Sequence, residues 1–166
     1  MPRRRIFWIA GLVILSVAAI VIITLALTPQ ETNPAFAAAT TFMNAAGKGD
    51  DAAASSLLSD EMQNYVQANC PNNSVSACIM GYTPADWGAL HSAVFRRAAP
   101  DGANWNVELI AIYEHDKGAS GVCSHYRMQQ DGSGQWRVYG WAGFLWCGDP
   151  RSRNMATNPD TPNRAP

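Results

Sequence analysis

The sequence carries almost no net charge and lacks the short motifs that mark most enzyme chemistry. Its formal charge is −1 at pH 7, and its only run of three basic residues is Arg3 to Arg5. No basic surface that would attract nucleic acid is therefore predicted. No glycine-rich phosphate loop and no Cys-x-x-Cys pair occur, and Gly132-Ser133-Gly134 is typical of a turn rather than of a nucleophile elbow. The motifs predict no catalytic residue, no metal site and no cofactor.

Charge is also absent from one long stretch near the N-terminus, Ile6 to Thr28. As a helix this stretch would be about 34 Å long at about 1.5 Å per residue, enough to cross a hydrocarbon core of about 30 Å. Trp8 suits the membrane interface, and the preceding arginines favour the cytoplasmic side. Residues 1–28 are therefore predicted to form an arginine-rich cytoplasmic end and a transmembrane helix. This predicts a single-pass protein of the cell membrane, with the lipid bilayer as one partner and an extracytoplasmic C-terminal domain.

A cleaved signal peptide is the alternative interpretation of this stretch. Ala35-Phe36-Ala37 has the small-x-small form of a cleavage site. Signal peptides use about 7 to 15 apolar residues, however, and the run here is longer. We therefore expect an uncleaved anchor.

The chain has few cysteines, and all of them follow the predicted anchor: Cys70, Cys78, Cys123 and Cys147. Disulfides persist outside the cytoplasm, so an even number of cysteines predicts two bridges. Cys70 and Cys78 flank a Pro-Asn-Asn-Ser turn, and a bridge that closes so small a loop would stabilise the fold by about 2.5 kcal/mol. Cys123 and Cys147 form the remaining pair, although four cysteines allow three connectivities and the sequence does not choose among them.

Composition divides the rest of the chain into three parts. Residues 29–33 form a linker, residues 34–147 the extracytoplasmic domain, and residues 148–166 a proline-rich tail without a core of its own. In the domain, Asn33 before Pro34 is typical of a capped helix start, and glycines 47 and 49 end the helical spacing of apolar residues. Shorter helices are expected from residue 51 and over residues 60–68.

A fourth helix is predicted after Thr83-Pro84-Ala85-Asp86, which has the form of a capping box. The residues that recur at helical spacing would form its inner face: Trp87, Leu90, His91, Val94 and Phe95. Residues 100–102, Pro-Asp-Gly, would end this helix.

The apolar pattern changes to alternation from Trp105 onward. Residues 105–115, 120–130 and 135–146 read as strands that are separated by turn residues. They predict three antiparallel strands in a meander. Helices followed by such strands predict an α+β fold, in which the helices pack on one face of a curved antiparallel sheet.

Two stretches carry a resemblance to a known family. AFAAATTFMNAAGKGDDAAASSLLSDEM, residues 35–62, resembles the opening helices of the nuclear transport factor 2-like superfamily, and QWRVYGWAGF, residues 135–144, resembles its last strand. The resemblance covers roughly residues 34–147. It implies a cystatin-like cone with a cavity between sheet and helices. Relatives use this cavity for isomerase or dehydratase chemistry or for ligand binding, and the fold also serves protein association.

Enzymes of that superfamily need a base in the cavity and a donor for the developing oxyanion. The candidate cavity residues are His91, Tyr113, His125 and Tyr126. An ordinary structural role is the alternative for both histidines, at the core or rim for the first and on a solvated strand face for the second. The candidate interface residues are Trp141, Phe144, Trp146, Arg151 and Arg153. Core packing is the alternative for the aromatic ones.

These features together predict a non-catalytic, membrane-anchored protein-binding module, an accessory subunit of a larger membrane protein complex. The sequence has no convergent acid and base and no metal pattern, while the anchor and the tail offer a partner two places of contact. The alternative is a small-molecule binder or an isomerase- or dehydratase-like enzyme that uses the cavity. An aromatic-filled interior would favour the first function, and an open pocket with a buried carboxylate or histidine the second.

Overall fold

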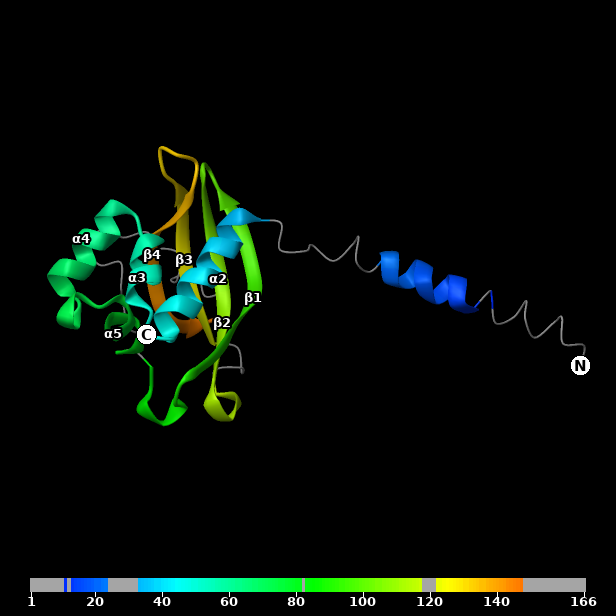
Figure 1. Ribbon diagram of the computed structural model, residues 1–166, viewed down its shortest axis with the longest axis horizontal. Coiled ribbons are helices and arrows are strands. Elements are labelled where there is room, and N and C mark those ends of the chain that lie inside the picture. The colour runs from blue at the N-terminus through cyan, green and yellow to red at the C-terminus, as the bar shows by residue number, and fades with distance from the viewer. Residues whose placement is uncertain (1–10, 12, 24–32, 82, 118–121, 148–166) are drawn as a thin grey trace, which may run out of the picture. The chain divides into compact units, whose positions relative to one another are not determined.

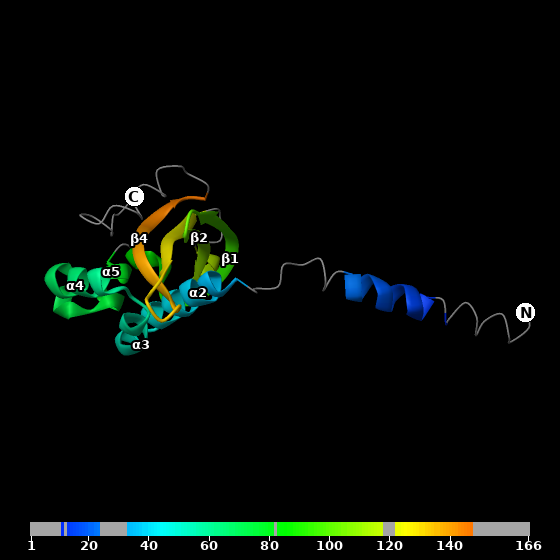
Figure 2. The same ribbon diagram turned by 90° about the horizontal axis from the view of Figure 1, so that it is seen from above.

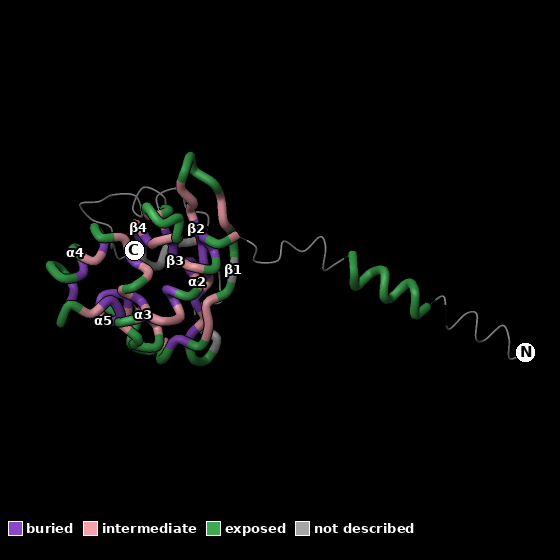
Figure 3. Tube along the Cα trace, turned by 45° about the horizontal axis from the view of Figure 1, so that its top comes forward, coloured by how far each residue is buried: buried purple, intermediate pink, exposed green. Residues whose placement is uncertain are grey.

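The computed structural model describes residues 11, 13–23, 33–81, 83–117 and 122–147. The chain divides into two compact units, residues 1–32 and 33–166. In the first unit, residues 13–23 are helical, and their large apolar side chains are half or more exposed (Figure 3). Across the described parts of the chain, no helix is both long and apolar enough to cross a membrane. Much of the predicted span, residues 6–10, 12 and 24–28, lies outside the described residues.

The second unit opens with the predicted long helix, α2, Pro34–Gly47. Asn33 caps it, because its Oδ1 accepts a hydrogen bond from the Ala35 amide at 3.0 Å, and Pro34 occupies the first turn, where no amide partner is needed. The helix ends beside the sheet. A Cβ on Gly47 would overlap the side chain of Leu90, so this position needs glycine for the close approach. The predicted helix and its cap are confirmed.

Three shorter helices follow: α3 (Asp51–Ser56), α4 (Asp60–Asn69) and α5 (Val75–Met80). Each begins at a polar side chain that accepts a backbone hydrogen bond, and these caps are Asp50, Ser59 and Ser74. The first two helices confirm the prediction. The sequence did not predict α5, which begins in the loop between the first two cysteines, after a single 3₁₀ turn, Pro71–Asn73, and contains Cys78.

Both disulfides are present in the structure. Cys70 is bonded to Cys78 with a Cα–Cα distance of 5.1 Å, and Cys123 is bonded to Cys147 with a Cα–Cα distance of 5.0 Å. The first bridge ties the end of α4 to α5, and the second ties β3 to the residue after β4. The predicted first bridge is confirmed, and the structure selects one of the three connectivities that the sequence allowed.

The predicted helix after Thr83 is wrong. A 3₁₀ turn, Ala85–Trp87, is followed by Gly88 in the left-handed region (φ 72°) and then by a strand. This strand, β1 (Leu90–Asp101), pairs with the next strand along its whole length. The apolar residues in this stretch fit a helical period by spacing alone, but ladder pairing with a neighbouring apolar strand decides the structure. Of the expected helical face, Leu90 is buried while His91 and Val94 are exposed.

The sheet is an antiparallel meander in the order β1-β2-β3-β4. The remaining strands are β2 (Asn104–Tyr113), β3 (Val122–Gln130) and β4 (Trp136–Trp146). The three predicted strands are confirmed, and β1 adds a fourth. Figures 1 and 2 show the strands curving over α2, with α3, α4 and α5 beyond its far end. The α+β class is therefore as predicted.

The core lies between α2 and the sheet face turned toward it, which we call the inner face. Leu109, Tyr126, Met128, Val138 and Trp141 are buried there from the strands. The sheet face opposite to α2 is here called the outer face. Strand alternation places Glu108 and His125 on it, because each sits between inner-face residues.

The connection between α3 and α4 attaches to the edge of the sheet. The Ser59 amide donates to the Val138 carbonyl at 2.9 Å, and the Val138 amide donates to the Leu57 carbonyl at 2.8 Å. Leu58 thereby forms a parallel bridge with Val138. This attachment covers part of the exposed edge of β4 and forms one side of the groove described below.

Candidate functional site

The structure does not bring the four predicted cavity residues together. His91 is exposed on β1, and His125 is buried on the outer face of the sheet. Tyr113 and Tyr126 are buried on the inner face, which is the other side of the sheet from His125. The predicted histidine base and the two tyrosine hydroxyls therefore do not share one cavity.

Aromatic and thioether side chains fill the space between α2 and the sheet. The Tyr126 hydroxyl donates to Met43 Sδ at 2.9 Å, and its ring meets Phe42 edge-on with centroids 5.7 Å apart. Trp141 stacks on Phe42 with the ring centroids 5.8 Å apart and 28° between the planes. These rings occupy the position at which the resemblance placed a cavity.

Neither inner tyrosine is suited to proton transfer near neutral pH. Burial raises the pKa of Tyr126 well above its usual value. Burial also raises the pKa of Tyr113, although a hydrogen bond with Thr83, 3.3 Å from its hydroxyl, acts in the opposite direction. The Tyr113 ring packs on Trp87 with centroids 5.4 Å apart. Both hydroxyls stay protonated and serve the core.

The predicted interface residues fall in three places. Trp141 is buried in the core against Phe42 and Tyr65, so it is not a surface residue. The side chains of Phe144 and Trp146 lie outside the described part of the structure, as do the tail residues, including Arg151 and Arg153.

A charged cluster that the sequence did not predict lies on the outer face. Arg96 and Arg97 of β1 each donate to one carboxylate oxygen of Glu108 on β2. His125 faces the same carboxylate from β3, with Nδ1 3.9 Å from Oε1. In register, Arg97, Glu108 and His125 are successive neighbours across three strands. The one sequence signal for this cluster is a single carboxylate, Glu108, in the middle of an apolar strand. The arginines that pair with it lie on β1, which the sequence predicted as a helix.

This cluster is built for structure rather than for catalysis. Both carboxylate oxygens of Glu108 accept charge-assisted hydrogen bonds from arginines, and these bonds hold the side chain in place. Glu108 and His125 are 5% and 4% exposed, so a substrate in solution does not reach them. A neighbouring pair, Arg127 and Asp101, extends the charged row, with Arg127 Nη1 also 3.2 Å from Asn106 Oδ1.

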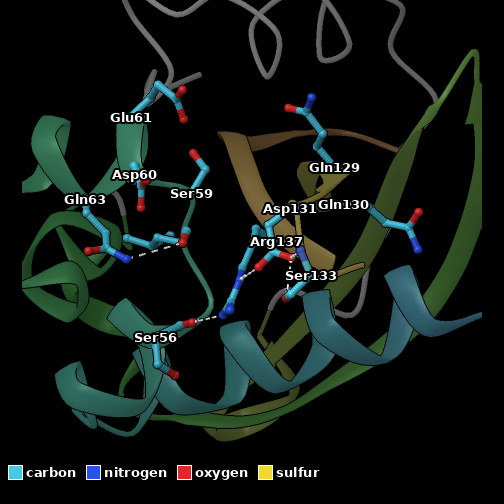
Figure 4. A pocket seen from close by; sticks show the side chains of 12 residues that line it. Ser56, Ser59, Asp60, Glu61, Gln63, Gln129, Gln130, Asp131, Ser133 and Arg137 are labelled. Atoms are coloured by element: carbon cyan, nitrogen blue, oxygen red, sulfur yellow. Dashed lines mark hydrogen bonds and ion pairs between the residues drawn. The ribbon is translucent and has the colours of Figure 1, made fainter. Parts of the chain in front are cut away.

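An open groove lies at the edge of the domain, between the α3–α4 connection and the β3–β4 hairpin (Figure 4). Its volume is about 560 Å³. The helical side contributes Ser56, Leu58, Ser59, Asp60, Glu61 and Gln63. The hairpin contributes Gln129, Gln130, Asp131, Gly132, Ser133 and Arg137. Nearly all of these side chains are polar, in contrast with the interior.

Arg137 joins the two sides of the groove. Its Nε donates to Asp131 Oδ2 at 2.8 Å, its Nη2 to Gln135 Oε1 at 2.7 Å, and its Nη1 to the Ser56 carbonyl (Figure 4). Hydrogen bonds from Ser133 and Arg137 lower the pKa of Asp131 well below its usual value, so this carboxylate is ionised. The three bonds of the Arg137 guanidinium are all intramolecular, so they hold the two sides of the groove together.

Two other carboxylates in the groove differ from Asp131, which is bonded to Arg137. Asp60 and Glu61 are exposed in the first turn of α4, and among the described residues neither forms an ion pair. The groove thus holds three carboxylates, with Asp131, against one guanidinium, Arg137, an excess of two negative charges. Opposite them, Gln129 and Gln130 are exposed and offer amide donors and acceptors. This chemistry suits a basic, hydrogen-bonding ligand.

Comparisons with protein-family models, with characterised proteins and with solved structures give no match. Among the described residues, no group of three or more His, Cys, Asp and Glu side chains is placed to hold a metal ion.

Proposed function

We propose that this chain is a single-pass membrane protein whose extracytoplasmic domain binds another protein without catalysing a reaction. The proposal keeps the predicted fold family, a nuclear transport factor 2-like cone, and the predicted role as an accessory subunit of a membrane complex. One observation carries it: the space between α2 and the sheet is filled by Phe42, Met43, Tyr126 and Trp141. A cavity enzyme of this family would need that space for its substrate.

The N-terminal unit supports the membrane part of the proposal. Along residues 13–23 the large apolar side chains point to every side of the helix, and each is 50 to 72% exposed. A helix that is apolar all round needs an apolar environment on all sides. In the sequence the uncharged run continues beyond this helix at both ends, from Ile6 to Thr28. A bilayer meets these requirements, and the basic residues before the run favour the cytoplasmic side.

The disulfides support the extracytoplasmic location. All four cysteines are bonded in pairs, and disulfides of this kind persist in oxidising compartments.

The groove is the surface that we assign to the partner. A peptide segment with a lysine or arginine could place its charge between Asp60 and Glu61 and its backbone against Gln129 and Gln130. The groove is open, so such a segment would gain electrostatic steering more than buried area. Phe144, Trp146, Arg151 and Arg153 remain predicted contacts in addition to the groove.

A second function is suggested by the size of the groove. About 560 Å³ is within the range of about 300–1,000 Å³ typical of small-molecule sites. Such sites are mostly apolar, whereas this groove is lined by charges and amides. A small polar ligand is therefore the alternative, and the experiment below separates it from a protein partner.

The test is crosslinking in native membranes, followed by purification of the chain and mass spectrometry of what is attached to it. Glu61→Gln should reduce the yield of the partner several-fold, because it removes one of the two available carboxylates. Asp86→Asn is the control, since Asp86 is an exposed carboxylate outside the groove, 3.9 Å from Lys117, and its substitution should leave the yield unchanged. An equal yield of partner from both variants would contradict the assignment of the groove as the binding surface. Recovery of the chain alone would contradict the proposal that its ligand is a protein.

A further inference from the structure

The groove uses most of its own hydrogen-bond donors within the domain. Seven of its side chains carry N–H or O–H groups, and five of these donate to oxygens of the protein: Ser56, Gln63, Gln130, Ser133 and Arg137. Gln63 Nε2, for example, lies 3.3 Å from the Ser55 carbonyl oxygen and 3.4 Å from that of Leu58. The two exceptions are Ser59 and Gln129.

The acceptors of the groove are open by contrast. Among the described residues, no hydrogen bond ends on the carboxylates of Asp60 and Glu61, or on the side-chain oxygens of Gln63, Gln129 and Gln130. These side chains come from both sides of the groove (Figure 4). The groove thus offers a ligand many acceptors and few donors, which favours a ligand rich in N–H groups.

We propose that the groove binds an arginine side chain of its partner in preference to a lysine. This inference rests on the proposed function, in which a basic segment of a protein occupies the groove. Both side chains carry one positive charge, so charge alone does not separate them. A guanidinium has five N–H groups spread over three nitrogens in a plane, whereas an ammonium has three on one atom. The guanidinium can therefore donate to a carboxylate on one side and to an amide oxygen on the other at the same time.

Arg137 shows how oxygens of this kind surround a guanidinium. Its three nitrogens donate to three types of acceptor: the carboxylate of Asp131, the side-chain amide oxygen of Gln135 and the backbone carbonyl of Ser56. A partner's arginine would meet the open carboxylates of the first turn of α4 and the amide oxygens of the hairpin. The ion pair with Asp131 also neutralises the Arg137 charge, which lowers its repulsion of a second guanidinium.

The test compares four end-blocked peptides of equal charge, Gly-Gly-X-Gly-Gly, in which X is arginine, asymmetric dimethylarginine, lysine or trimethyllysine. Their side chains carry five, three, three and no N–H groups. Binding to the ¹⁵N-labelled full chain in detergent is followed by NMR through the amide resonances of the groove. The arginine peptide should bind roughly fivefold more tightly than the lysine peptide, the effect of about one additional hydrogen bond. The trimethyllysine peptide should bind most weakly.

A variant separates donor recognition from charge. Gln129→Ala removes an amide oxygen without changing the charge, and it should reduce the preference for the arginine peptide to about twofold. Gln129 is exposed and has no described hydrogen bond, so the fold does not depend on it. Gln67→Ala is the matched control, because Gln67 is an exposed glutamine of α4 outside the groove and should leave the preference unchanged. Glu61→Gln should weaken the binding of all four peptides.

The outcomes distinguish this inference from the proposed function. Equal binding of the four peptides, with a common loss in Glu61→Gln, would overturn the preference and leave the proposed function in place. Tighter binding of the lysine peptide would also overturn it. Ethylguanidinium has the same head group without a peptide backbone and should bind more weakly than the arginine peptide; equal binding would overturn the assignment to a protein side chain. If no peptide shifts the groove resonances, the inference and the assignment of the groove fail together, and crosslinking in native membranes still tests the protein partner.

Discussion

Both faces of the sheet hold buried residues, yet these are of opposite chemistry. The inner face packs rings and a thioether, with Phe42 in contact with both Tyr126 and Trp141. The outer face buries Glu108 under Arg96 and Arg97, with His125 beside it. Apolar burial stabilises by about 25 cal/mol per Å², whereas a buried ion network often stabilises no more, and sometimes less, than apolar residues of the same size. We infer that the inner face supplies stability and that the outer face fixes which strands pair and in which register.

The largest effect is expected on the inner face. Phe42→Ala removes the ring that both Tyr126 and Trp141 contact, and should lower the free energy of unfolding by about 3 to 5 kcal/mol, the usual loss for a buried phenylalanine. Urea unfolding of the full chain in detergent measures it. Phe42→Leu is the control and should lose less than half as much. A loss below about 1 kcal/mol for the alanine variant would contradict the assignment of stability to this face.

The two disulfides provide the next comparison, because they lie in different parts of the domain. On the chain-entropy model, Cys123→Ala with Cys147→Ala should cost about 3.5 kcal/mol and Cys70→Ala with Cys78→Ala about 2.5 kcal/mol. The difference follows from the sequence separations of 24 and 8 residues. Unfolding of both double variants under the same conditions tests the order. The reverse order would show that local packing outweighs loop length at these sites.

A smaller loss is expected on the outer face. Glu108→Gln leaves two guanidinium groups without their carboxylate, and breaking a buried pair can cost about 3 to 5 kcal/mol. Arg96 and Arg97 are 33% and 47% exposed and can turn to water, so we expect about 2 kcal/mol. Arg97→Gln is the control, with a loss below about 1 kcal/mol. A Glu108→Gln loss as large as that of Phe42→Ala would remove the distinction between the two faces.

The smallest effect on stability near neutral pH is expected at Tyr126 of the inner face. Burial raises the pKa of Tyr126, so the folded state keeps this proton at pH values at which the unfolded chain releases it. Its contribution to stability is therefore complete below about pH 10 and falls as pH rises toward the folded pKa, by up to about 1.4 kcal/mol per pH unit. Tyr126→Phe should flatten this slope, whereas Tyr139→Phe, at a half-buried position on β4, is the comparison variant. Identical slopes in both variants would contradict the assignment.

Sequence signals predicted the elements whose causes are local. Asn33 and Asp50 cap their helices through side chains within three residues, and turn residues separate the last three strands. The first bridge was predictable because Cys70 and Cys78 close a short loop. Each of these features depends on residues that are neighbours in the chain.

The features that the sequence did not predict depend on pairing at long range. β1 was predicted as a helix because its apolar residues match the helical period, and only its ladder with β2 decides otherwise. The Glu108 cluster requires that ladder. The groove is formed by Ser56–Gln63 and Gln129–Arg137, which lie far apart in the chain and meet through the bridge between Leu58 and Val138 and the bond from Arg137 to the Ser56 carbonyl. No local pattern contains that information.

The packing of α2 against β4 has a consequence for how the domain is made. Phe42 of the first helix in the domain is stacked on Trp141 of the last strand, about a hundred residues later in synthesis. Until β4 has been translated, Phe42 lacks that cover, and contacts of such long range form slowly. A nascent chain that ends before Trp136 should remain unfolded, with its apolar residues available to chaperones. The order of translation thus delays folding of this domain until nearly all of it has left the ribosome.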